Sequence, residues 1–437
     1  MKTFHFTFLL ILAGYLSSAQ LYFPPVNSST WSVTDPAALG WCQKKIDTLY
    51  KFLEANNTKA FILLKDGKIV LEKYLNGHSQ TSLWYWASAG KTFTSTLVGI
   101  AQQENFLKIS DSTSKYLGKG WSSCTPEQED KITIKHQLTM TSGLDDGVTD
   151  PFCTLSSCLI YKAPAGTRWS YHNGPYTLLD GVIEKATGMT LNQFATQKIK
   201  ITTGMDGLFI KQDYNNVYFS TARSMARFGL LILNKGRWND IPVLSDQQYY
   251  NEMVNTSQNI NESYGYLWWL NGKNGFMVPQ SQIKFPGRLF QSAPADMFSA
   301  LGKNGQFVNV IPSQNMVWIR MGDNPDNSLV PFLFNEDLSK YINALSCTSS
   351  NKDITASDIP EYNIFPNPVT EYIHIEQNNT ERNSVQCKIF DAMGRIVHQG
   401  FYEGKSFLIN TQGFNQGLHF LQIRKNNAVQ TLKFVKE

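Results

Sequence analysis

Charge is scarce in this chain of 437 residues, since Asp, Glu, Lys and Arg make up only 17% of it and the formal net charge is +4. A nucleic-acid-binding surface needs Lys and Arg clustered on one face, so the charge balance does not indicate a nucleic-acid partner. The sequence also lacks a Walker phosphate-binding loop, a Gly-x-Gly-x-x-Gly turn and a His-Glu-x-x-His motif. Nucleotide-dependent and zinc-protease functions are therefore without support.

Long apolar runs are absent apart from a short one near the N-terminus. Lys2 supplies a positive charge, Phe6 to Leu16 is apolar, and Ser17-Ser18-Ala19 offers small residues for cleavage before Gln20. The run is shorter than the roughly 20 residues of a membrane span, and no Cys follows the cleavage point for lipid attachment. We therefore expect a signal peptide at residues 1–19, no stable membrane span, and a soluble protein exported through the periplasm.

Cysteine is sparse, and its spacing does not indicate a metal site. The six cysteines are Cys42, Cys124, Cys153, Cys158, Cys347 and Cys387. They allow many pairings, among which Cys153 and Cys158 are close enough in sequence to close a small loop, so we predict a disulfide there. No second Cys pair and no His pair stands at zinc-ligand spacing, so we expect no metal and no cofactor.

Apolar and aromatic residues are abundant, with 42% hydrophobic residues, 27 Phe, 19 Tyr and 10 Trp. This composition excludes a wholly disordered, collagenous or coiled-coil chain. All ten Trp lie between Trp31 and Trp318, and the chain becomes polar between residues 346 and 361. We therefore predict a large domain at residues 20–345, a linker at 346–361 and a small domain at 362–437.

The small domain shows short segments in which apolar and polar residues alternate, as in half-buried strands. They are Tyr372–Ile375, Val385–Phe390, Ser406–Ile409, Leu418–Ile423 and Val429–Val435. Several such strands in so short a stretch predict a small all-β sandwich.

Short motifs in this tail carry a family resemblance. They are Phe365-Pro366-Asn367-Pro368-Val369, Asp391 with Gly394-Arg395, Gly417 with Phe420-Leu421 and Ile423, and Lys433-Phe434-Val435-Lys436. In this order and spacing they resemble the C-terminal sorting domain of the type IX secretion system. The resemblance implies the type IX machinery as a partner, a bacterium of the Bacteroidota, and a product that is secreted or attached to the cell surface. The alternative is a sandwich that binds carbohydrate or another protein.

The large domain mixes strands and helices. Phe61–Leu75 predicts a hairpin, because Asp66-Gly67 supplies the positive-φ positions of a tight turn, and Phe307–Met321 predicts a second one. Helical periods fall between the hairpins, at Phe93–Gln103, Leu178–Ala186 and Thr221–Leu233. Strands at both ends with helices between them predict an α+β fold, in which one antiparallel sheet is flanked by helices.

Ser88 and Lys91 form a candidate nucleophile and base. Ser88 opens a predicted helix, where unpaired N–H groups and the helix dipole favour developing negative charge. Lys91 lies three residues on and shares its helix face. Among aromatic neighbours its pKa falls, and the neutral amine can then take the hydroxyl proton. Ser-x-x-Lys also occurs at Ser112/Lys115, Ser281/Lys284 and Ser349/Lys352, but none of these opens a long apolar helix.

Two further segments carry candidate site residues. Tyr171-His172-Asn173 lies on a Gly- and Pro-bounded loop before an amphipathic helix. We expect the cationic lysine to lower the pKa of the Tyr171 phenol, and the Asn173 amide to orient a substrate carbonyl. Ala300–Gln306 leads into the late hairpin, where its glycines permit close approach of the strand edge to a ligand.

With these three elements in order, the large domain resembles the serine β-lactamase and penicillin-binding-protein superfamily, near the class C-like esterases and 6-aminohexanoate-dimer hydrolases. Further matching phrases are His136–Leu144, Ala222–Gly229 and Tyr264–Trp269. The resemblance implies a helical subdomain beside the sheet. It also implies acylation of Ser88, Lys91 with Tyr171 as base and acid, help from Asn173, and an oxyanion hole at the N–H groups of Ser88 and Lys303.

One departure from the family pattern bears on the substrate. Penicillin-active relatives carry Lys-Thr-Gly or His-x-Gly where this chain has Ala300-Leu301-Gly302, so the cation that binds a carboxylate is missing. We therefore expect a small neutral ester or amide as substrate. The alternatives are a β-lactamase or D-alanyl-D-alanine carboxypeptidase, and a catalytically silent binding protein. Asp145, Asp146 and Asp150 either face the cleft, where they would contact an amine, or belong to a solvated loop.

Overall fold

The computed structural model describes residues 21–326, 328, 330–347, 362–377, 384–391, 395–425 and 428–437. The predicted signal peptide at residues 1–19 and residues 348–361 of the predicted linker lie outside the described residues. The chain divides into two units, Met1–Cys347 and Thr348–Glu437.

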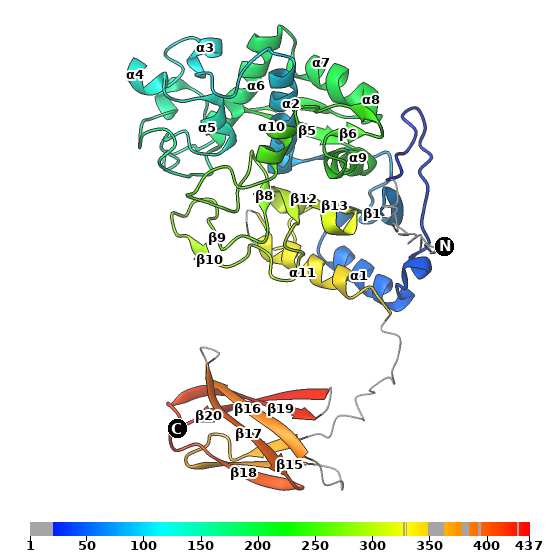
Figure 1. The fold of residues 1–437 in the computed structure, drawn as a ribbon, viewed down its shortest axis with the longest axis vertical. Coiled ribbons are helices and arrows are strands. Elements are labelled where there is room, and N and C mark those ends of the chain that lie inside the picture. The colour runs from blue at the N-terminus through cyan, green and yellow to red at the C-terminus, as the bar shows by residue number, and fades with distance from the viewer. Residues whose placement is uncertain are drawn as a thin grey trace, which may run out of the picture. The chain divides into compact units, whose positions relative to one another are not determined.

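The first unit is built around a six-stranded antiparallel sheet in the order β2-β1-β13-β12-β11-β8 (Figure 1). Its strands are β1 (Thr58–Lys65), β2 (Lys68–Tyr74), β8 (Trp269–Leu270), β11 (Phe298–Gly302), β12 (Gln306–Ile311) and β13 (Met316–Gly322). Early and late segments meet where β1 pairs with β13, with Ile62 opposite Ile319. The predicted α+β layout is confirmed.

Both predicted hairpins form, and the first one shows why Asp-Gly is needed at its turn. Asp66 and Gly67 have φ values of 51° and 80°, as the tight turn between β1 and β2 requires. Gly67 also lies against the chain near Tyr22, where an added Cβ would come within 1.9 Å of the Tyr22 carbonyl oxygen. The turn therefore needs glycine for its space as well as for its conformation.

Helices cover both faces of this sheet. They are α1 (Gln43–Ala55), α9 (Ala222–Leu233) and α11 (Phe332–Asn343). Helix α9 begins after Thr221, whose side chain accepts from the Ser224 N–H, and packs on β1, β12 and β13. Helices α1 and α11 pack against each other at the other face (Figure 1).

A helical subdomain lies beside the sheet, as expected. Its two long helices, α2 (Lys91–Gln103) and α6 (Asn173–Thr187), pack against each other. The shorter helices are α3 (Ser114–Leu117), α4 (Pro126–Glu129), α5 (Ile134–Leu138), α7 (Leu191–Ala195), α8 (Ile201–Thr203) and α10 (Gln247–Met253). The short strands are β3 (Trp84–Tyr85), β4 (Leu208–Gln212), β5 (Asn215–Ser220), β6 (Arg237–Trp238), β7 (Ile241–Pro242), β9 (Gly275–Phe276) and β10 (Phe285–Pro286).

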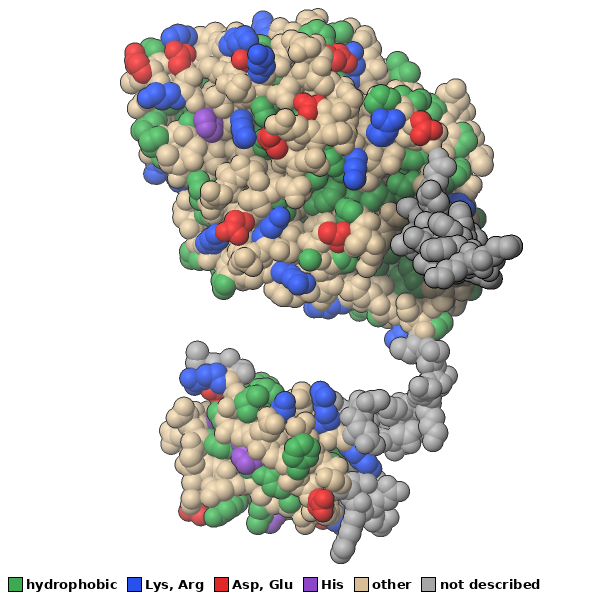
Figure 2. Space-filling view, viewed as in Figure 1, with side chains coloured by type: hydrophobic (Ala, Val, Ile, Leu, Met, Phe, Trp, Pro, Cys, Tyr) green, Lys and Arg blue, Asp and Glu red, His purple; other side chains and the backbone are tan. Residues whose placement is uncertain are grey.

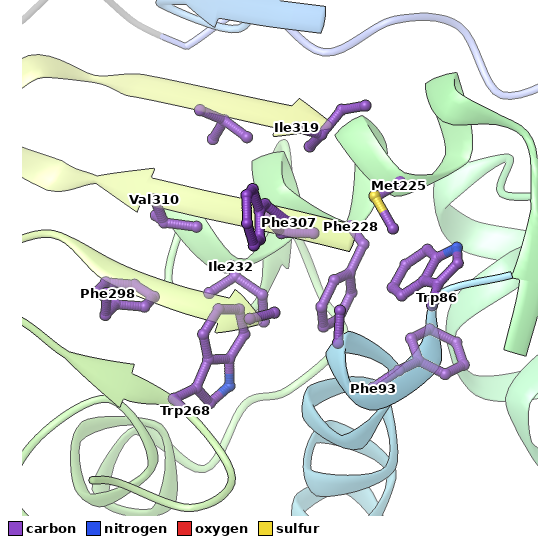
Figure 3. Close-up of a cluster of buried hydrophobic side chains, with 14 of the residues drawn as sticks. Trp86, Phe93, Met225, Phe228, Ile232, Trp268, Phe298, Phe307, Val310 and Ile319 are labelled. Atoms are coloured by element: carbon purple, nitrogen blue, oxygen red, sulfur yellow. The ribbon is translucent and has the colours of Figure 1, made fainter. Parts of the chain in front are cut away.

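The core of this unit joins the sheet to the start of α2. Figure 3 shows Trp86 and Phe93 facing Phe228 of α9, with Phe307 and Ile319 of the sheet beyond them. The Trp86 ring lies edge-on to Tyr218, with ring centroids 5.0 Å apart, and its Nε1 donates to Ser220 Oγ at 2.8 Å. Full burial of such a ring contributes roughly 1.5–3 kcal/mol, so the segment before Ser88 is firmly anchored.

Two disulfides lie in the first unit. The predicted Cys153–Cys158 bridge is present, and Cys42 pairs with Cys347, a link that the sequence left open. Cys124 and Cys387 are free thiols. In the face of this unit seen in Figure 2, Lys and Arg are interspersed with Asp and Glu.

The second unit consists of two antiparallel sheets around one apolar core, as predicted. One sheet has the order β14-β15-β18 and the other β17-β16-β19-β20. The strands are β14 (Tyr362–Phe365), β15 (Tyr372–Gln377), β16 (Ser384–Asp391), β17 (Ile396–Glu403), β18 (Ser406–Asn410), β19 (Gly417–Lys425) and β20 (Ala428–Lys436). Strands β14 and β17 were not predicted, because both are edge strands with weak alternation of burial. No helix in the described parts of the chain is long and apolar enough to span a membrane.

Candidate active site

Ser88 lies in a single 3₁₀ turn, Ala87–Gly90, between β3 and α2. The Trp86 N–H donates to the Tyr218 carbonyl oxygen at 2.8 Å, which fixes the entry to this turn. Ala87 has a φ of 46°, a left-handed conformation that costs a non-glycine residue roughly 1–3 kcal/mol. The anchored neighbours hold this strained residue directly before Ser88.

Lys91 is the first residue of α2, and its side chain turns back to Ser88. Its Nζ donates to Ser88 Oγ at 2.9 Å and lies 4.4 Å from the ring centroid of Tyr176. The side chain is 5% exposed, and burial lowers the pKa of Lys91 to about 7, while the charge of Asp180 opposes this shift. The predicted fall in the lysine pKa is confirmed, and the neutral amine is accessible near neutral pH.

Tyr171 lies close to both Lys91 and Ser88, with its ring centroid 5.3 Å from Lys91 Nζ. The ring stacks on Trp269 at 5.8 Å. Burial raises the pKa of Tyr171 to about 12, although a hydrogen bond with Ser88 acts in the opposite direction. The expectation of a lowered phenol pKa is therefore wrong, because desolvation outweighs the field of a lysine that itself loses its charge near pH 7. Tyr171 keeps its proton at neutral pH and is suited to donate it.

Asn173 begins α6 and faces the cleft next to Tyr171. It is 8% exposed, and its Oδ1 has no hydrogen-bond partner among the described residues. A buried acceptor without a partner is costly unless a ligand satisfies it. His172, between these two residues, is 1% exposed, and burial lowers its pKa to about 4, so it is a buried neutral side chain. His136 serves its own helix, since its Nδ1 accepts from the Thr133 N–H.

The third predicted element, at the end of β11, lies directly behind the Ser88 turn. A Cβ on Gly302 would come within 2.6 Å of the Trp86 carbonyl oxygen and 3.0 Å of the Ala89 nitrogen. Glycine is therefore required for the strand to approach this turn. Lys303 follows and lines the cleft, whereas Gly302 is not among the lining residues.

These elements surround a cleft of about 500 Å³. Ser88, Lys91, Tyr171, Asn173 and Lys303 all line it, so the structure brings five of the six predicted site residues to one surface. Further lining residues come from β3, the Ser88 turn, the loop before the Cys153–Cys158 disulfide, α6, the β4–β5 hairpin, the loop after β9, the turn after β11 and the segment before α11. They are Tyr85, Ala87, Asp146, Pro151, Phe152, Tyr176, Gln212, Asn215, Asn216, Val217, Phe219, Pro279, Gln280, Asn304 and Val330.

The other Ser-x-x-Lys pairs have no comparable surroundings. Lys115 pairs with Asp111 at 2.8 Å, and Lys284 pairs with Glu262 at 2.8 Å, both near the surface. Ser349 and Lys352 lie outside the described residues.

The three aspartates after residue 144 differ in their placement. Asp146 lines the cleft, but its carboxylate pairs with Arg168 at 2.6 Å. Asp145 pairs with Lys162 at 3.3 Å, and Asp150 accepts from the Phe152 N–H, so both have the roles of loop residues.

Sequence reasoning missed several residues of the site on α6 and β5. Tyr176 and Asp180 follow Asn173 at spacings of three and seven, which place all three on one helix face. That periodicity could have revealed them. Asn215 and Asn216 have the composition of an ordinary turn, and nothing in the sequence around them predicts that they line the cleft.

Each of the two units matches a known protein family. Residues 54–325 match the family model described as Beta-lactamase, and residues 363–437 match the model described as Secretion system C-terminal sorting domain. Among curated proteins, Penicillin-binding protein 4* of Bacillus subtilis is 27% identical over 190 residues, which cover 38% of this chain and 41% of that protein. This chain thus spans less than half the length of that curated relative.

Solved structures show the same fold. A Bacteroides dorei protein described as a β-lactamase has a TM-score of 0.56 at 16% identity, and the match covers 70% of this chain and 99% of that one. A Bacillus anthracis protein described as a 6-aminohexanoate-dimer hydrolase has a TM-score of 0.53 at 20% identity, with coverage of 74% and 87%. At these identities the likeness concerns the fold alone.

Proposed function

The chain belongs to the Beta-lactamase family, and from this premise we propose that it is a secreted serine hydrolase that cleaves an ester or amide bond through an acyl-enzyme on Ser88. The observation that carries the proposal is the 2.9 Å contact between Lys91 Nζ and Ser88 Oγ at a cleft. A buried amine whose pKa is lowered to about 7 is a competent base for a serine hydroxyl near neutral pH.

In the proposed mechanism, neutral Lys91 takes the proton of Ser88 while Oγ attacks the substrate carbonyl carbon. Backbone N–H groups of Ser88 and Lys303 stabilise the resulting oxyanion. Tyr171 donates its proton to the leaving oxygen or nitrogen as the bond to the carbonyl carbon breaks, and Lys91 returns a proton to Tyr171. Water then attacks the acyl-enzyme by the reverse sequence of proton transfers and releases the acid. Asn173 Oδ1 would accept a hydrogen bond from the bound substrate.

We propose a neutral substrate, because Ala300-Leu301-Gly302 stands at the end of β11 without a cationic side chain. A β-lactam or a peptidoglycan peptide carries a carboxylate that would lack this partner. Turnover of such compounds at a rate equal to that of neutral esters would favour the β-lactamase or carboxypeptidase alternative.

The test is intact-mass analysis of the folded chain after incubation with a fluorophosphonate probe, followed by peptide mapping. We expect one adduct on Ser88, no adduct in Ser88→Ala, and labelling slowed at least about 100-fold in Lys91→Ala. Lys115→Ala serves as a matched control and should label at the wild-type rate, because Lys115 belongs to a Ser-x-x-Lys pair outside the cleft and pairs with Asp111. A folded protein without an adduct would favour the silent binding protein instead.

The C-terminal sorting domain indicates export by the type IX secretion system. We propose that residues 1–19 are the signal peptide, 20–345 the hydrolase domain and 346–361 a linker, in a bacterium of the Bacteroidota. The sorting machinery would then act on residues 362–437 and leave the hydrolase domain outside the cell or attached to its surface.

A further inference from the structure

One wall of the cleft is formed by the small sheet β3-β5-β4. Alternation along β5 places Asn215, Val217 and Phe219 on the same face, and all three line the cleft. Tyr85 of β3 is paired with Phe219, and their ring centroids are 6.2 Å apart. The wall is therefore polar at the Asn215 end and aromatic at the Phe219 end.

Six carboxamide side chains line this cleft. They come from α6, the β4–β5 hairpin, the loop after β9 and the turn after β11, and they are Asn173, Gln212, Asn215, Asn216, Gln280 and Asn304. Each carboxamide can donate and accept hydrogen bonds, which is what a hydroxyl group requires of its partner. Gln212 and Gln280 are exposed, and Asn173 Oδ1 is a buried acceptor without a partner among the described residues.

Several of these groups are held in place by their neighbours. Asn304 Nδ2 donates to the Tyr85 hydroxyl at 2.7 Å, which fixes the aromatic end of the wall. Asn215 Oδ1 accepts from Thr177 Oγ1 at 3.2 Å, which orients the polar end. A prearranged wall of this kind reduces the entropy lost when a ligand binds.

Charge contributes little to recognition on this wall. Asp146, the one carboxylate among the described lining residues, is paired with Arg168. Of the two lining cations, Lys91 contacts Ser88 and Lys303 has an exposed side chain at the turn after β11. A ligand with hydroxyl groups and an apolar face thus matches the wall better than an ionic one does.

We propose that this wall binds the alcohol half of the substrate, and that this half is an uncharged sugar ring carrying an O-acyl group. The inference rests on the proposed function and narrows its substrate class. Ring hydroxyls would pair with the carboxamides, and the C–H face would pack on Tyr85 and Phe219. Ser88 takes the acyl group, the bond between the acyl carbon and the sugar oxygen breaks, and the sugar leaves as an alcohol. Water then releases the carboxylic acid.

A matched pair of substrates tests this inference on the full chain. Methyl 6-O-acetyl-β-D-glucopyranoside and cyclohexylmethyl acetate share a primary acetate on a six-membered ring and differ in the hydroxyls. We expect kcat/KM to be at least about tenfold higher for the sugar ester, since unpaired site groups penalise the analogue without hydroxyls. Equal or faster hydrolysis of the cyclohexyl ester would overturn the inference, as would faster hydrolysis of an acetate ester that bears a carboxylate or an ammonium group.

Substitutions that keep the size of a side chain but remove its carboxamide test whether the preference for the sugar ester comes from this wall. Gln212→Met and Asn215→Leu should each lower the sugar-to-cyclohexyl ratio of kcat/KM about fivefold, the loss expected for one hydrogen bond. Gln248→Ala, on the exposed surface of α10, removes a carboxamide outside the cleft and should leave the ratio unchanged. Gln212 is exposed, so its variant is expected to fold even if Asn215→Leu does not. An unchanged ratio in folded Gln212→Met would contradict a role for this wall in hydroxyl recognition.

Two readouts separate failure of the inference from failure of the proposed function. If p-nitrophenyl acetate is turned over and the probe labels Ser88, yet the sugar ester has no advantage, only the sugar inference fails. If neither reaction occurs on folded protein, the proposed function fails. In that case, binding of the two esters to Ser88→Ala, measured by ligand-observed NMR, still tests sugar recognition. Tighter binding of the sugar ester than of the cyclohexyl ester supports the sugar inference, and equal binding contradicts it.

Discussion

Lys91 must lose its own proton before it can accept one from Ser88, so the pKa of this amine sets the lower pH limit of the reaction. Burial lowers this pKa to about 7. The active neutral form therefore increases as pH rises, and we expect kcat/KM for p-nitrophenyl acetate to rise through pH 7 and level off above it. Stopped-flow assays between pH 5 and pH 9, in buffers of constant ionic strength, measure this profile.

The control for this pH profile is Lys91→Arg, which keeps a cation that does not deprotonate in this range. We expect it to lose activity by about 10²–10⁴-fold at every pH. A wild-type rate that still climbs steeply between pH 8 and pH 9 would mean that Lys91 is not buried as the structure places it.

Asp180 is a positioning residue one helical turn beyond Tyr176. Its carboxyl is buried, accepts from Asn216 Nδ2 at 3.0 Å, and has a pKa raised by burial to about 7. When ionised, Asp180 raises the pKa of Lys91. Asp180→Asn removes this charge, so the acid limb of the kcat/KM profile should move to lower pH. The rate at pH 7, where Asp180 is partly ionised, should increase by up to about twofold, and the rate at pH 6, where the carboxyl is mostly protonated, should change little.

Glu184→Gln is the matched control for Asp180→Asn, because it removes the same charge one turn further along α6. Its effect on the acid limb should be smaller, since Glu184 acts on Asp180 and not directly on Lys91. An Asp180→Asn profile that superimposes on that of the wild type would show that the carboxyl has only a packing role.

Single residues differ in how far their placement could be predicted. The gathering of Ser88, Lys91 and Tyr171 at one cleft could be predicted, because each lies in a motif with a fixed spacing to a helix or loop. The pKa of Tyr171 could not be predicted, since it is raised by burial among residues distant in sequence, of which Trp269 is one. The same holds for Asp180, whose influence on Lys91 follows from the packing of α6 against α2.

At the scale of elements, the contact between β11 and the Ser88 turn permits only glycine. In Gly302→Ala the Cβ would meet the Trp86 carbonyl oxygen at 2.6 Å, so the strand and the turn must separate. A displacement of this kind between reacting groups lowers rates by about 100-fold. We expect that loss in fluorophosphonate labelling of Ser88, together with a modest fall in melting temperature.

The control for Gly302→Ala is the same substitution at a glycine where an added Cβ would have enough space. At Gly181 of α6 an added Cβ would meet only Leu117 Cδ2, at 3.4 Å, so Gly181→Ala should label at the wild-type rate. Equal labelling of both variants would show that the approach of β11 does not set the geometry of the nucleophile.

Elements with strong local signals could be predicted, and those that depend on neighbours could not. The β1–β2 hairpin follows from Asp66-Gly67, and α9 follows from its apolar period after Thr221. Strand β5 begins at Asn215-Asn216, which predicts a turn, and becomes a strand because β4 and β3 pair with it. The polar wall of the cleft depends on that pairing and is invisible in the sequence.

At the scale of the whole chain, the change in composition near residue 346 predicted two units, but the closure of the first unit was not foreseen. Cys347 pairs with Cys42 across 305 residues of sequence, and the Cys42 N–H donates to the Leu345 carbonyl oxygen at 2.9 Å. Sequence alone cannot pair these cysteines, because their proximity is a product of the fold.

This disulfide yields a prediction about the stability of the hydrolase unit. Cys347→Ser should lower the free energy of unfolding of that unit by about 2–5 kcal/mol, since the bridge restrains a long loop of the unfolded chain. All ten Trp lie between Trp31 and Trp318, so Trp fluorescence during urea unfolding reports this unit alone. Cys124→Ser, which removes a free thiol, is the control. Reductant breaks the Cys153–Cys158 bridge in both proteins and the Cys42–Cys347 bridge in the wild type alone. The wild type and Cys347→Ser should therefore have equal free energies of unfolding in reductant. Equal wild-type and Cys347→Ser stability without reductant would mean that the bridge does not restrain the unit.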